Sequence, residues 1–423
     1  MTTSLTSQER VRHVQEALPA TRLREGADWL VSPEAFPINS KPLHYLENLG
    51  QRLYVFQKAC NLLYRQSVNG KQPEWIARWL DAGKPQAVIE LGRADFQKNL
   101  LPKVIRPDLL ITENGFAMTE IDSVPGGIGI TSWLCRTYAG LGEDVIGGAE
   151  SLRETFLKTY PTEQVVLAEE GLSYHPEWEW LLGPERVKRA ETYRFSPGQP
   201  VYRFFEMHDW MNLEGLRKSH SPEATVNPPL KAFLEEKMWL ALLWMKPLAE
   251  FWRRELGAAY FRDLLALVPQ SWVVEPTELP PTAVLPGLEV QSWKEVMAFS
   301  QKERELVLKV SGFSPLAWGS RGVEVGSDLS EVTWREVLEK ALDEFSQSPR
   351  ILMRFAKTAV VEHLHATREG EMKLMKGRVR LTPFYIVENE RARLQSILAT
   401  ICPIDKKIIH GMQDAVLVPA KKV

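Results

Sequence analysis

The sequence lacks the features that mark secreted, membrane-spanning and zinc-binding proteins. Its 423 residues include three cysteines, Cys60, Cys135 and Cys402, and no CxxC pair, so neither a disulfide framework nor a zinc site is expected. No apolar run approaches about 18 residues, the length of a membrane-spanning helix. The first residues are polar and charged and lack the apolar core of a signal peptide. We therefore expect a cytoplasmic protein with no membrane partner.

An excess of either charge is also missing. The chain has 52 basic and 54 acidic residues, a net charge of -2, and so offers no general electrostatic surface for nucleic acid. Two common nucleotide motifs, GxxxxGK followed by Ser or Thr and GxGxxG, do not occur. Any anion that the protein binds must therefore be held locally, by residues outside these motifs.

The chain divides into segments with different residue patterns, as expected for its length at about 150 residues per domain. Residues 1–95 carry apolar residues at helical spacings and are predicted to form a helical region. Short strands follow over 96–150. Helices and strands alternate over 151–285, which ends in a long helix over 228–257 and a proline-rich connection. They alternate again over 286–423, so the predicted fold class is mixed α/β.

The most informative segment is DLLITENGFAMTEIDSVPGG, which begins at Asp108. FAMTEID alternates apolar and polar residues like a strand with one exposed face, so Glu120 and Asp122 should project the same way. The Asn-Gly turn predicts a hairpin that brings Asp108 beside this pair. Neighbouring carboxylates repel each other unless a cation lies between them, and hard oxygen ligands suit Mg²⁺ that carries phosphates.

A second informative segment, LVLKVSGFSPLAWGSRGVEVG, places Lys309 at the end of a buried strand. A glycine-containing loop follows, with Gly312, Gly319, Ser320, Arg321 and Gly322. Glycines let backbone N–H groups approach phosphate oxygens, and the lysine supplies a positive charge for the same anion. The segment predicts a loop that covers phosphates.

Each segment alone also fits an ordinary surface feature. Lys309 and its glycines could form a simple surface hairpin, and exposed carboxylates on a strand are usually solvated. The presence of both segments in one chain favours a functional site over two unrelated surface features. One chain that carries a carboxylate cluster for Mg²⁺ and a lysine with a glycine loop for phosphates has both halves of a nucleoside triphosphate site.

These residues resemble a known superfamily. TEIDSVPGG looks like the magnesium-binding signature of ATP-grasp ligases, and LKVSGFSPLAWGSRGV resembles their phosphate-binding strand and glycine loop. Ordinary ATP-grasp chains have the lysine before the metal carboxylates, whereas here Glu120 precedes Lys309. This order resembles the circularly permuted ATP-grasp group, which includes the glutathionylspermidine synthases. The resemblance covers about 100–150 and 290–419, and implies a permuted ATP-grasp fold behind a helical N-terminal region.

The resemblance also implies roles for individual residues. Asp108, Glu120 and Asp122 would hold Mg²⁺, although Asp122 stands where the family usually has Asn. Arg106 would stabilise the transferred phosphoryl group. The remaining implied residues are Lys309 and Arg321 in catalysis, and Lys309, Gly319, Ser320 and Gly322 around the phosphates of ATP.

Several C-terminal residues carry weaker signals. Met353 and Phe355, in RILMRFA, occupy the place where ATP-grasp folds put the strand beside the adenine, but they equally fit an ordinary core. GRVRLTPFYIV sets Arg378 and Arg380 on one strand face. The segment IIHGMQDAVLVP contributes His410, Gly411 and Asp414, and a histidine at such a turn is more often structural than functional.

The leading hypothesis is therefore an ATP- and Mg²⁺-dependent ligase that activates a small carboxylate as an acyl phosphate and joins it to an amine. One alternative keeps the nucleotide site but transfers the phosphoryl group directly. Another is a catalytically degenerate protein that binds nucleotide or a partner. The sequence leaves open which acid and amine would react, the oligomeric state and the role of the helical N-terminal region.

Overall fold

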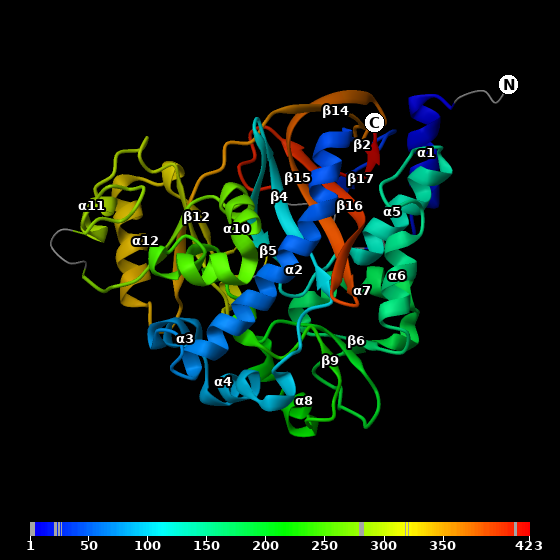
Figure 1. The fold of residues 1–423 in the computed structure, drawn as a ribbon. Coiled ribbons are helices and arrows are strands. Elements are labelled where there is room, and N and C mark those ends of the chain that lie inside the picture. The colour runs from blue at the N-terminus through cyan, green and yellow to red at the C-terminus, as the bar shows by residue number, and fades with distance from the viewer. Residues whose placement is uncertain are drawn as a thin grey trace.

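The computed structural model describes residues 5–20, 23, 26, 28–278, 283–317, 319, 321–409 and 413–423. Its largest element is a sheet that comprises nine strands within these residues, in the order β1-β17-β16-β15-β4-β5 with β2, β3 and β14 attached at its sides (Figure 1). The strands are β1 (Asp28–Leu30), β2 (Phe36–Ile38), β3 (Val104–Ile105), β4 (Pro107–Thr112), β5 (Gly115–Ile121), β14 (Val361–Ala366), β15 (Met372–Glu388), β16 (Arg391–Pro403) and β17 (Gln413–Lys422).

This sheet joins the two ends of the chain. The hairpin of β4 and β5 pairs with β15 next to the long C-terminal strands, and the short strands β1 and β2 pair in parallel with β17. The predicted Asn-Gly hairpin is confirmed, because Thr112 pairs with Gly115 across the turn. The N-terminal residues therefore do more than form helices, since they also extend the C-terminal part of the sheet.

Helices cover this sheet. The helix α2 (Ser40–Val68) packs on β15 and β16 so closely that a Cβ atom on Gly50 would lie 2.3 Å from the Tyr385 ring, while the Tyr385 hydroxyl donates to the Leu46 carbonyl at 2.7 Å. Further helices are α1 (Ser7–Ala17), α3 (Glu74–Asp81), α4 (Gln86–Arg93), α5 (Ile128–Gly140) and α6 (Ser151–Thr159). In Figure 1, α2 crosses in front of the strands, and α5 and α6 lie to their right.

A smaller parallel sheet occupies the region between residues 160 and 230. Its strands run β7-β6-β8-β9 and all neighbours are parallel, so the expected α/β unit is present. The strands are β6 (Gln164–Leu167), β7 (Val187–Arg189), β8 (Val201–Phe204) and β9 (Val226–Asn227), accompanied by α7 (His175–Leu182) and α8 (Glu214–Ser219).

The helix predicted over 228–257 is wrong. The structure instead has two separate helices, α9 (Met238–Leu242) and α10 (Ala249–Leu267), with short 3₁₀ turns at Ala232–Glu235 and Lys246–Leu248. Pro247 explains the interruption, because proline lacks a backbone N–H and disfavours the helical conformation in the residue before it. The proline-rich connection that follows lies partly outside the described residues.

A third sheet, of strands β10 (Ser271–Val274), β13 (Arg350–Arg354), β11 (Leu306–Val310) and β12 (Val323–Val325), is antiparallel throughout. The helices α11 (Trp293–Met297) and α12 (Glu331–Asp343) pack on it, and together they form the lobe at the left of Figure 1. Ser330 caps α12 by accepting from the Thr333 N–H at 3.1 Å.

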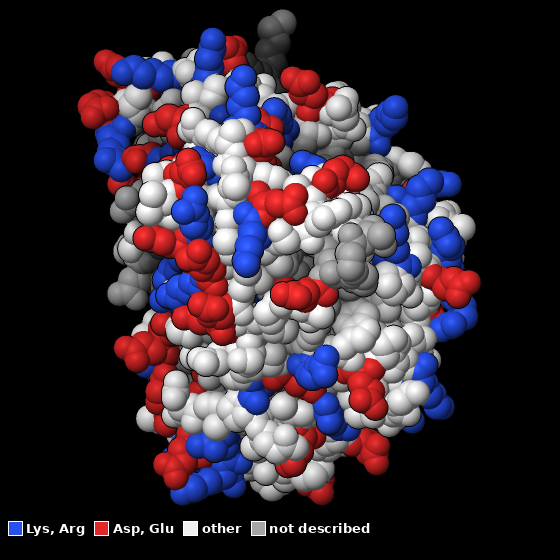
Figure 2. Space-filling view, turned by 90° about the vertical axis from the view of Figure 1, so that its left-hand side faces the viewer, with Lys and Arg blue, Asp and Glu red and all other residues white. Residues whose placement is uncertain are grey.

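Charge is distributed evenly over the surface that can be seen. Figure 2 shows basic and acidic side chains interspersed over one face, without a large region of either sign. This agrees with the near-zero net charge. Among the described residues, none of the helices has the length and apolar character needed to cross a lipid bilayer.

Candidate active site

A cavity of about 340 Å³ lies between the nine-stranded sheet and the sheet of β10–β13. Its floor consists of side chains from β4, β15, β16 and β17 together with the end of β5, and the opposite wall comes from β11, β12 and the glycine loop. Tyr174 and Glu206, from the small parallel-sheet unit, close one end. The cavity therefore collects residues from the nine-stranded sheet, the sheet of β10–β13 and the small parallel-sheet unit.

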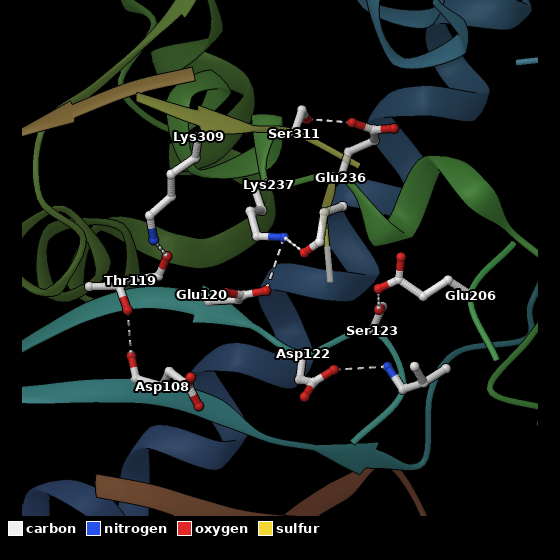
Figure 3. Close-up of polar contacts among 12 residues, drawn as sticks. Asp108, Thr119, Glu120, Asp122, Ser123, Glu206, Glu236, Lys237, Lys309 and Ser311 are labelled. Carbon is white, nitrogen blue, oxygen red and sulfur yellow. Dashed lines mark hydrogen bonds and ion pairs between the residues drawn. The ribbon is translucent and has the colours of Figure 1, made fainter. Parts of the chain in front are cut away.

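The three carboxylates predicted to hold metal all line this cavity. The hairpin register sets Asp108 opposite Glu120, and a local irregularity follows between Asp108 and Leu109. Asp122 lies just past the end of β5, where its backbone N–H donates to the Arg106 carbonyl at 2.9 Å. Figure 3 shows the three side chains on the two neighbouring strands. The prediction that the hairpin brings them together is confirmed.

Each carboxylate is paired with a basic side chain. Arg106 forms an ion pair with Asp122 and lies 3.7 Å from Asp108. Arg380, on β15, donates to Asp108 at 2.9 Å. Burial opposes the charge on Arg106, but Asp122 and Asp108 outweigh it and raise the arginine pKa. Burial would likewise raise the pKa of Asp108, but Arg380, Arg106 and Lys309 outweigh it and lower that pKa.

Lys309 reaches the cavity from the opposite wall. It lies on β11, its residue is 8% exposed, and its Nζ donates to the Thr119 carbonyl of the hairpin at 3.0 Å (Figure 3). Burial lowers the pKa of this lysine. The two informative segments, 190 residues apart in the chain, therefore meet in one site.

A second lysine, Lys237, was missed by the sequence analysis. Its Nζ lies 3.0 Å from Glu120 Oε1 and 3.3 Å from the carbonyl of Ala317 in the glycine loop. Burial opposes its charge, but Glu120 and Glu206 outweigh that and raise its pKa. The sequence held no signal for this role, because Lys237 falls in a segment that was predicted to be a long helix.

A buried brace holds Lys237 and Lys309 on a common frame. The Lys237 N–H donates to the Ser311 carbonyl at 2.8 Å, and the Met238 N–H donates to the Ser311 hydroxyl at 2.9 Å. Glu236 accepts from the same hydroxyl and forms an ion pair with Lys84 in which both side chains are 1% exposed. Ser311 lies two residues after Lys309, so this network fixes the spacing of the two lysines.

Glu206 is an acidic residue of the cavity that the sequence did not predict. It lines the cavity beside Asp122 and accepts from the Ser123 hydroxyl at 3.1 Å (Figure 3). Burial, reinforced by the charge of Glu235, raises the pKa of Glu206 to about 8. No motif surrounds this residue in the sequence, so only its position in the folded chain brings it to the site.

The structure places some of the predicted glycine-loop residues at the cavity and others elsewhere. Gly319 and Gly322 line the cavity. Arg321 is not among the lining residues, and its exposed side chain forms an ion pair with Glu170 at 3.0 Å. Ser320 lies outside the described residues.

The C-terminal candidates are divided in the same way. Met353 and Phe355 line a second cavity of about 110 Å³, which shares Lys309, Asp108 and Glu120 with the first. Arg378 also lines this second cavity, whereas Asp414 pairs with Arg368 and Lys406. His410 and Gly411 lie outside the described residues. Met353 is also a core residue at 1% exposure, so both expectations for it are compatible with its position.

The carboxylates of Asp108, Glu120 and Asp122 are chemically suited to Mg²⁺, although their arrangement is not that of a formed metal site. Among the described residues, no group of three His, Cys, Asp or Glu side chains forms a ready-made metal site. The three carboxylates nevertheless line one cavity, and Asp108 Oδ1 is buried with no hydrogen-bond partner in the described part of the chain. Carboxylate oxygens are the ligands that Mg²⁺ prefers.

Comparison with known proteins supports the fold. No protein-family model matches the chain, and no curated protein matches its sequence. One matching solved structure is that of a glutathione synthetase-like effector (GSS30) from Globodera pallida in its apo form, with a TM-score of 0.52 and 10% identity over 99% of this chain and 98% of that one.

A second match is a protein provisionally assigned as a gamma-glutamylcysteine synthetase from Methylobacillus flagellatus KT. It is 12% identical over 84% of this chain and 86% of that one, with a TM-score of 0.39, which is too low to establish a common fold. The chain therefore shares the overall fold of the glutathione synthetase-like effector, and the expected mixed α/β class is confirmed.

Proposed function

We propose that this protein is an ATP- and Mg²⁺-dependent ligase that activates a carboxylate as an acyl phosphate and joins it to an amine. The observation that carries the proposal is the cavity between the two sheets, which is lined by the carboxylates of Asp108, Glu120 and Asp122 and by two lysines, Lys237 and Lys309. This arrangement matches the demands of phosphoryl transfer, in which positioning and neutralisation of phosphate charge provide most of the catalysis.

The two lysines are the proposed contacts of the ATP phosphates. Lys309 reaches the carboxylates from the opposite wall, Lys237 contacts Glu120, and Gly319 and Gly322 line the same cavity. The adjoining cavity, lined by Met353 and Phe355, is the proposed adenine site. The apolar side chains on part of its lining and its continuity with the first cavity at Lys309 support this assignment.

Asp108, Glu120 and Asp122 are the proposed magnesium ligands. Bound Mg²⁺ would neutralise phosphate oxygens and hold them in line for transfer. Arg106, between Asp122 and Asp108, is positioned to stabilise charge on the transferred phosphoryl group. In the first step a carboxylate oxygen attacks the γ-phosphorus and ADP leaves. In the second the amine nitrogen attacks the acyl carbon, phosphate leaves and the nitrogen loses a proton.

The order of these residues along the chain supports a circularly permuted ATP-grasp arrangement. The carboxylate hairpin precedes Lys309, and the β15–β17 strands that complete its sheet come from the C-terminus. Such an order is expected if the segments of an ordinary ATP-grasp core were rejoined with the metal-binding hairpin first.

The proposal is tested by trapping the activated acid. The protein is incubated with Mg²⁺, ATP, a panel of small acids and hydroxylamine, and both ADP and hydroxamate are measured. A ligase gives ADP and hydroxamate in equal amounts with its own acid, and an amide when its amine replaces hydroxylamine. ADP with a stable phosphorylated product would establish phosphoryl transfer instead.

Variants then test the site. Glu120→Gln and Lys309→Ala should abolish hydroxamate formation, whereas Arg321→Gln, which alters an exposed ion pair and a residue that does not line the cavity, should retain it. Binding of ATP without turnover for any acid, amine or polyamine would favour the nucleotide-binding alternative. Full activity of the Glu120 and Lys309 variants would show that the site is wrongly assigned.

A further inference from the structure

Two threonine hydroxyls on the cavity floor have no assigned role. Thr382, on β15, is 2% exposed and Thr400, on β16, is fully buried. Both residues line the cavity, and neither hydroxyl has a hydrogen-bond partner in the part of the chain that the structure describes. A buried hydroxyl without a hydrogen-bond partner is unfavourable for the folded state. These hydroxyls are therefore available to a molecule inside the cavity.

The strand register groups the two threonines with Arg380. Arg380 lies directly opposite Thr400 on the neighbouring strand and two residues before Thr382 on its own strand. Residues two apart share one face of a sheet, and directly opposed Cβ atoms lie about 4.5–5.5 Å apart. The three side chains therefore form a compact triangle on the floor, and Arg380 Nε is buried without a hydrogen-bond partner among the described residues.

The rest of this part of the floor is apolar. Leu398 lies opposite Thr382, and Leu417 lies opposite Thr400 on β17. Both leucines line the cavity. A ligand here would meet two hydroxyls, an apolar surface and Arg380, whose Nη1 donates to Asp108 at 2.9 Å while its Nε has no partner among the described residues.

We propose that Arg380, Thr382 and Thr400 form a subsite for a small acid that carries a hydroxyl or amino group on the carbon next to its carboxylate. Arg380 binds the carboxylate, the threonines bind the neighbouring hydroxyl or amino group, and a short apolar side chain packs on Leu398 and Leu417. These three side chains lie close together on neighbouring strands, so the carboxylate of the acid and its second polar group must also lie close together. This inference rests on the proposed function only in that it names the acid to be activated.

The experiment uses the full chain and three probes of similar size. L-lactate and L-alanine have the neighbouring hydroxyl or amino group, and propionate does not. Their affinities are measured by ligand-detected NMR, without nucleotide. At least one of L-lactate and L-alanine should bind about tenfold more tightly than propionate, the effect expected for paired instead of unpaired buried hydroxyls.

Substitutions locate this selectivity. Thr382→Val and Thr400→Val keep the shape of the side chain but remove the hydroxyl, so the affinity ratio should fall towards one, and Thr382→Ser should restore it. Thr131→Val is the matched control. Thr131 is also fully buried with an unpaired hydroxyl in the described structure, but it belongs to α5 and is not among the cavity-lining residues.

The outcomes separate this subsite from the proposed function. Equal affinities for the three probes, no binding of any probe, or a ratio unchanged by the two valine variants would overturn the subsite. Binding of a non-hydrolysable ATP analogue is measured on the same samples and depends on other residues. Loss of that binding with retained lactate or alanine selectivity would count against the ATP site alone.

Discussion

The Lys237 ammonium lies 3.0 Å from the Glu120 carboxylate, and this contact joins Lys237 to the β4–β5 hairpin. The lysine side chain is 10% exposed and the glutamate side chain is 34% exposed. If Mg²⁺ and a triphosphate bind, the carboxylate must turn to the cation and the lysine to the phosphates. The ion pair is therefore a resting arrangement that ligand binding would replace.

This exchange predicts that Glu120→Gln has opposite effects with and without Mg²⁺. Without the metal, loss of a negative charge beside Lys237 should strengthen ATP binding. With the metal, loss of a carboxylate ligand should weaken it, by about tenfold or more. The measurement is calorimetric titration of ATP in EDTA and in Mg²⁺. Glu113→Gln, at the exposed tip of the same hairpin, is the control, and a change of the same sign under both conditions would contradict the proposed exchange.

Lys309 should be required for nucleotide binding. Charge-assisted hydrogen bonds contribute about 1.5–3 kcal/mol, so Lys309→Ala should weaken ATP binding about tenfold to a hundredfold. Lys302→Ala, at an exposed position before the same strand, should leave the affinity unchanged. Equal affinities of the two variants would remove Lys309 from the site. Thermal unfolding of both variants checks that the fold is retained.

The buried ion pair of Lys84 and Glu236 should matter for stability. Removing one partner of a buried pair leaves an uncompensated charge, so Lys84→Met should lower the free energy of unfolding by about 3–5 kcal/mol. Lys218→Met is the matched control, because Lys218 pairs with Glu214 on the surface at 75% and 65% exposure, and it should change stability by less than about 0.5 kcal/mol. Urea denaturation measures both, and a similar effect of the two variants would contradict a buried brace.

Glu206 predicts a pH dependence of stability. Its pKa in the folded chain is raised to about 8, whereas the same carboxyl in the unfolded chain ionises near pH 4.3. Between these values the folded state holds the extra proton, so its contribution to stability falls as pH rises through this window and is constant above pH 8. The slope is at most about 1.4 kcal/mol per pH unit.

The variant Glu206→Gln removes this titrating group. Its free energy of unfolding, measured by urea denaturation in EDTA, should therefore fall less over about two pH units, from about pH 5.5 to about pH 7.5, than that of the unsubstituted protein. Glu113→Gln should behave like the unsubstituted protein. If Glu206→Gln shows the same decline, the carboxyl does not hold its proton in the folded state.

Part of this structure could be predicted from short-range sequence patterns. The Asn-Gly turn and the alternation in FAMTEID predicted the β4–β5 hairpin. These features depend on neighbours in the sequence, through backbone conformation and side-chain alternation. The helix predicted over 228–257 is wrong because Pro247 interrupts it and the segment folds as separate shorter helices.

The sequence by itself determined the mixed α/β class, the hairpin with Asp108, Glu120 and Asp122, and the strand that carries Lys309. Only the tertiary structure decided that Lys237, Glu206 and the threonine floor share their cavity, and that Arg321 does not line it. Such meetings depend on which distant segments bury surface against each other, and no short-range pattern encodes that choice. The carboxylates could be predicted because turn chemistry brings them together with the nearby Arg106, whereas Lys237, Lys309 and Arg380 come from segments more than a hundred residues away.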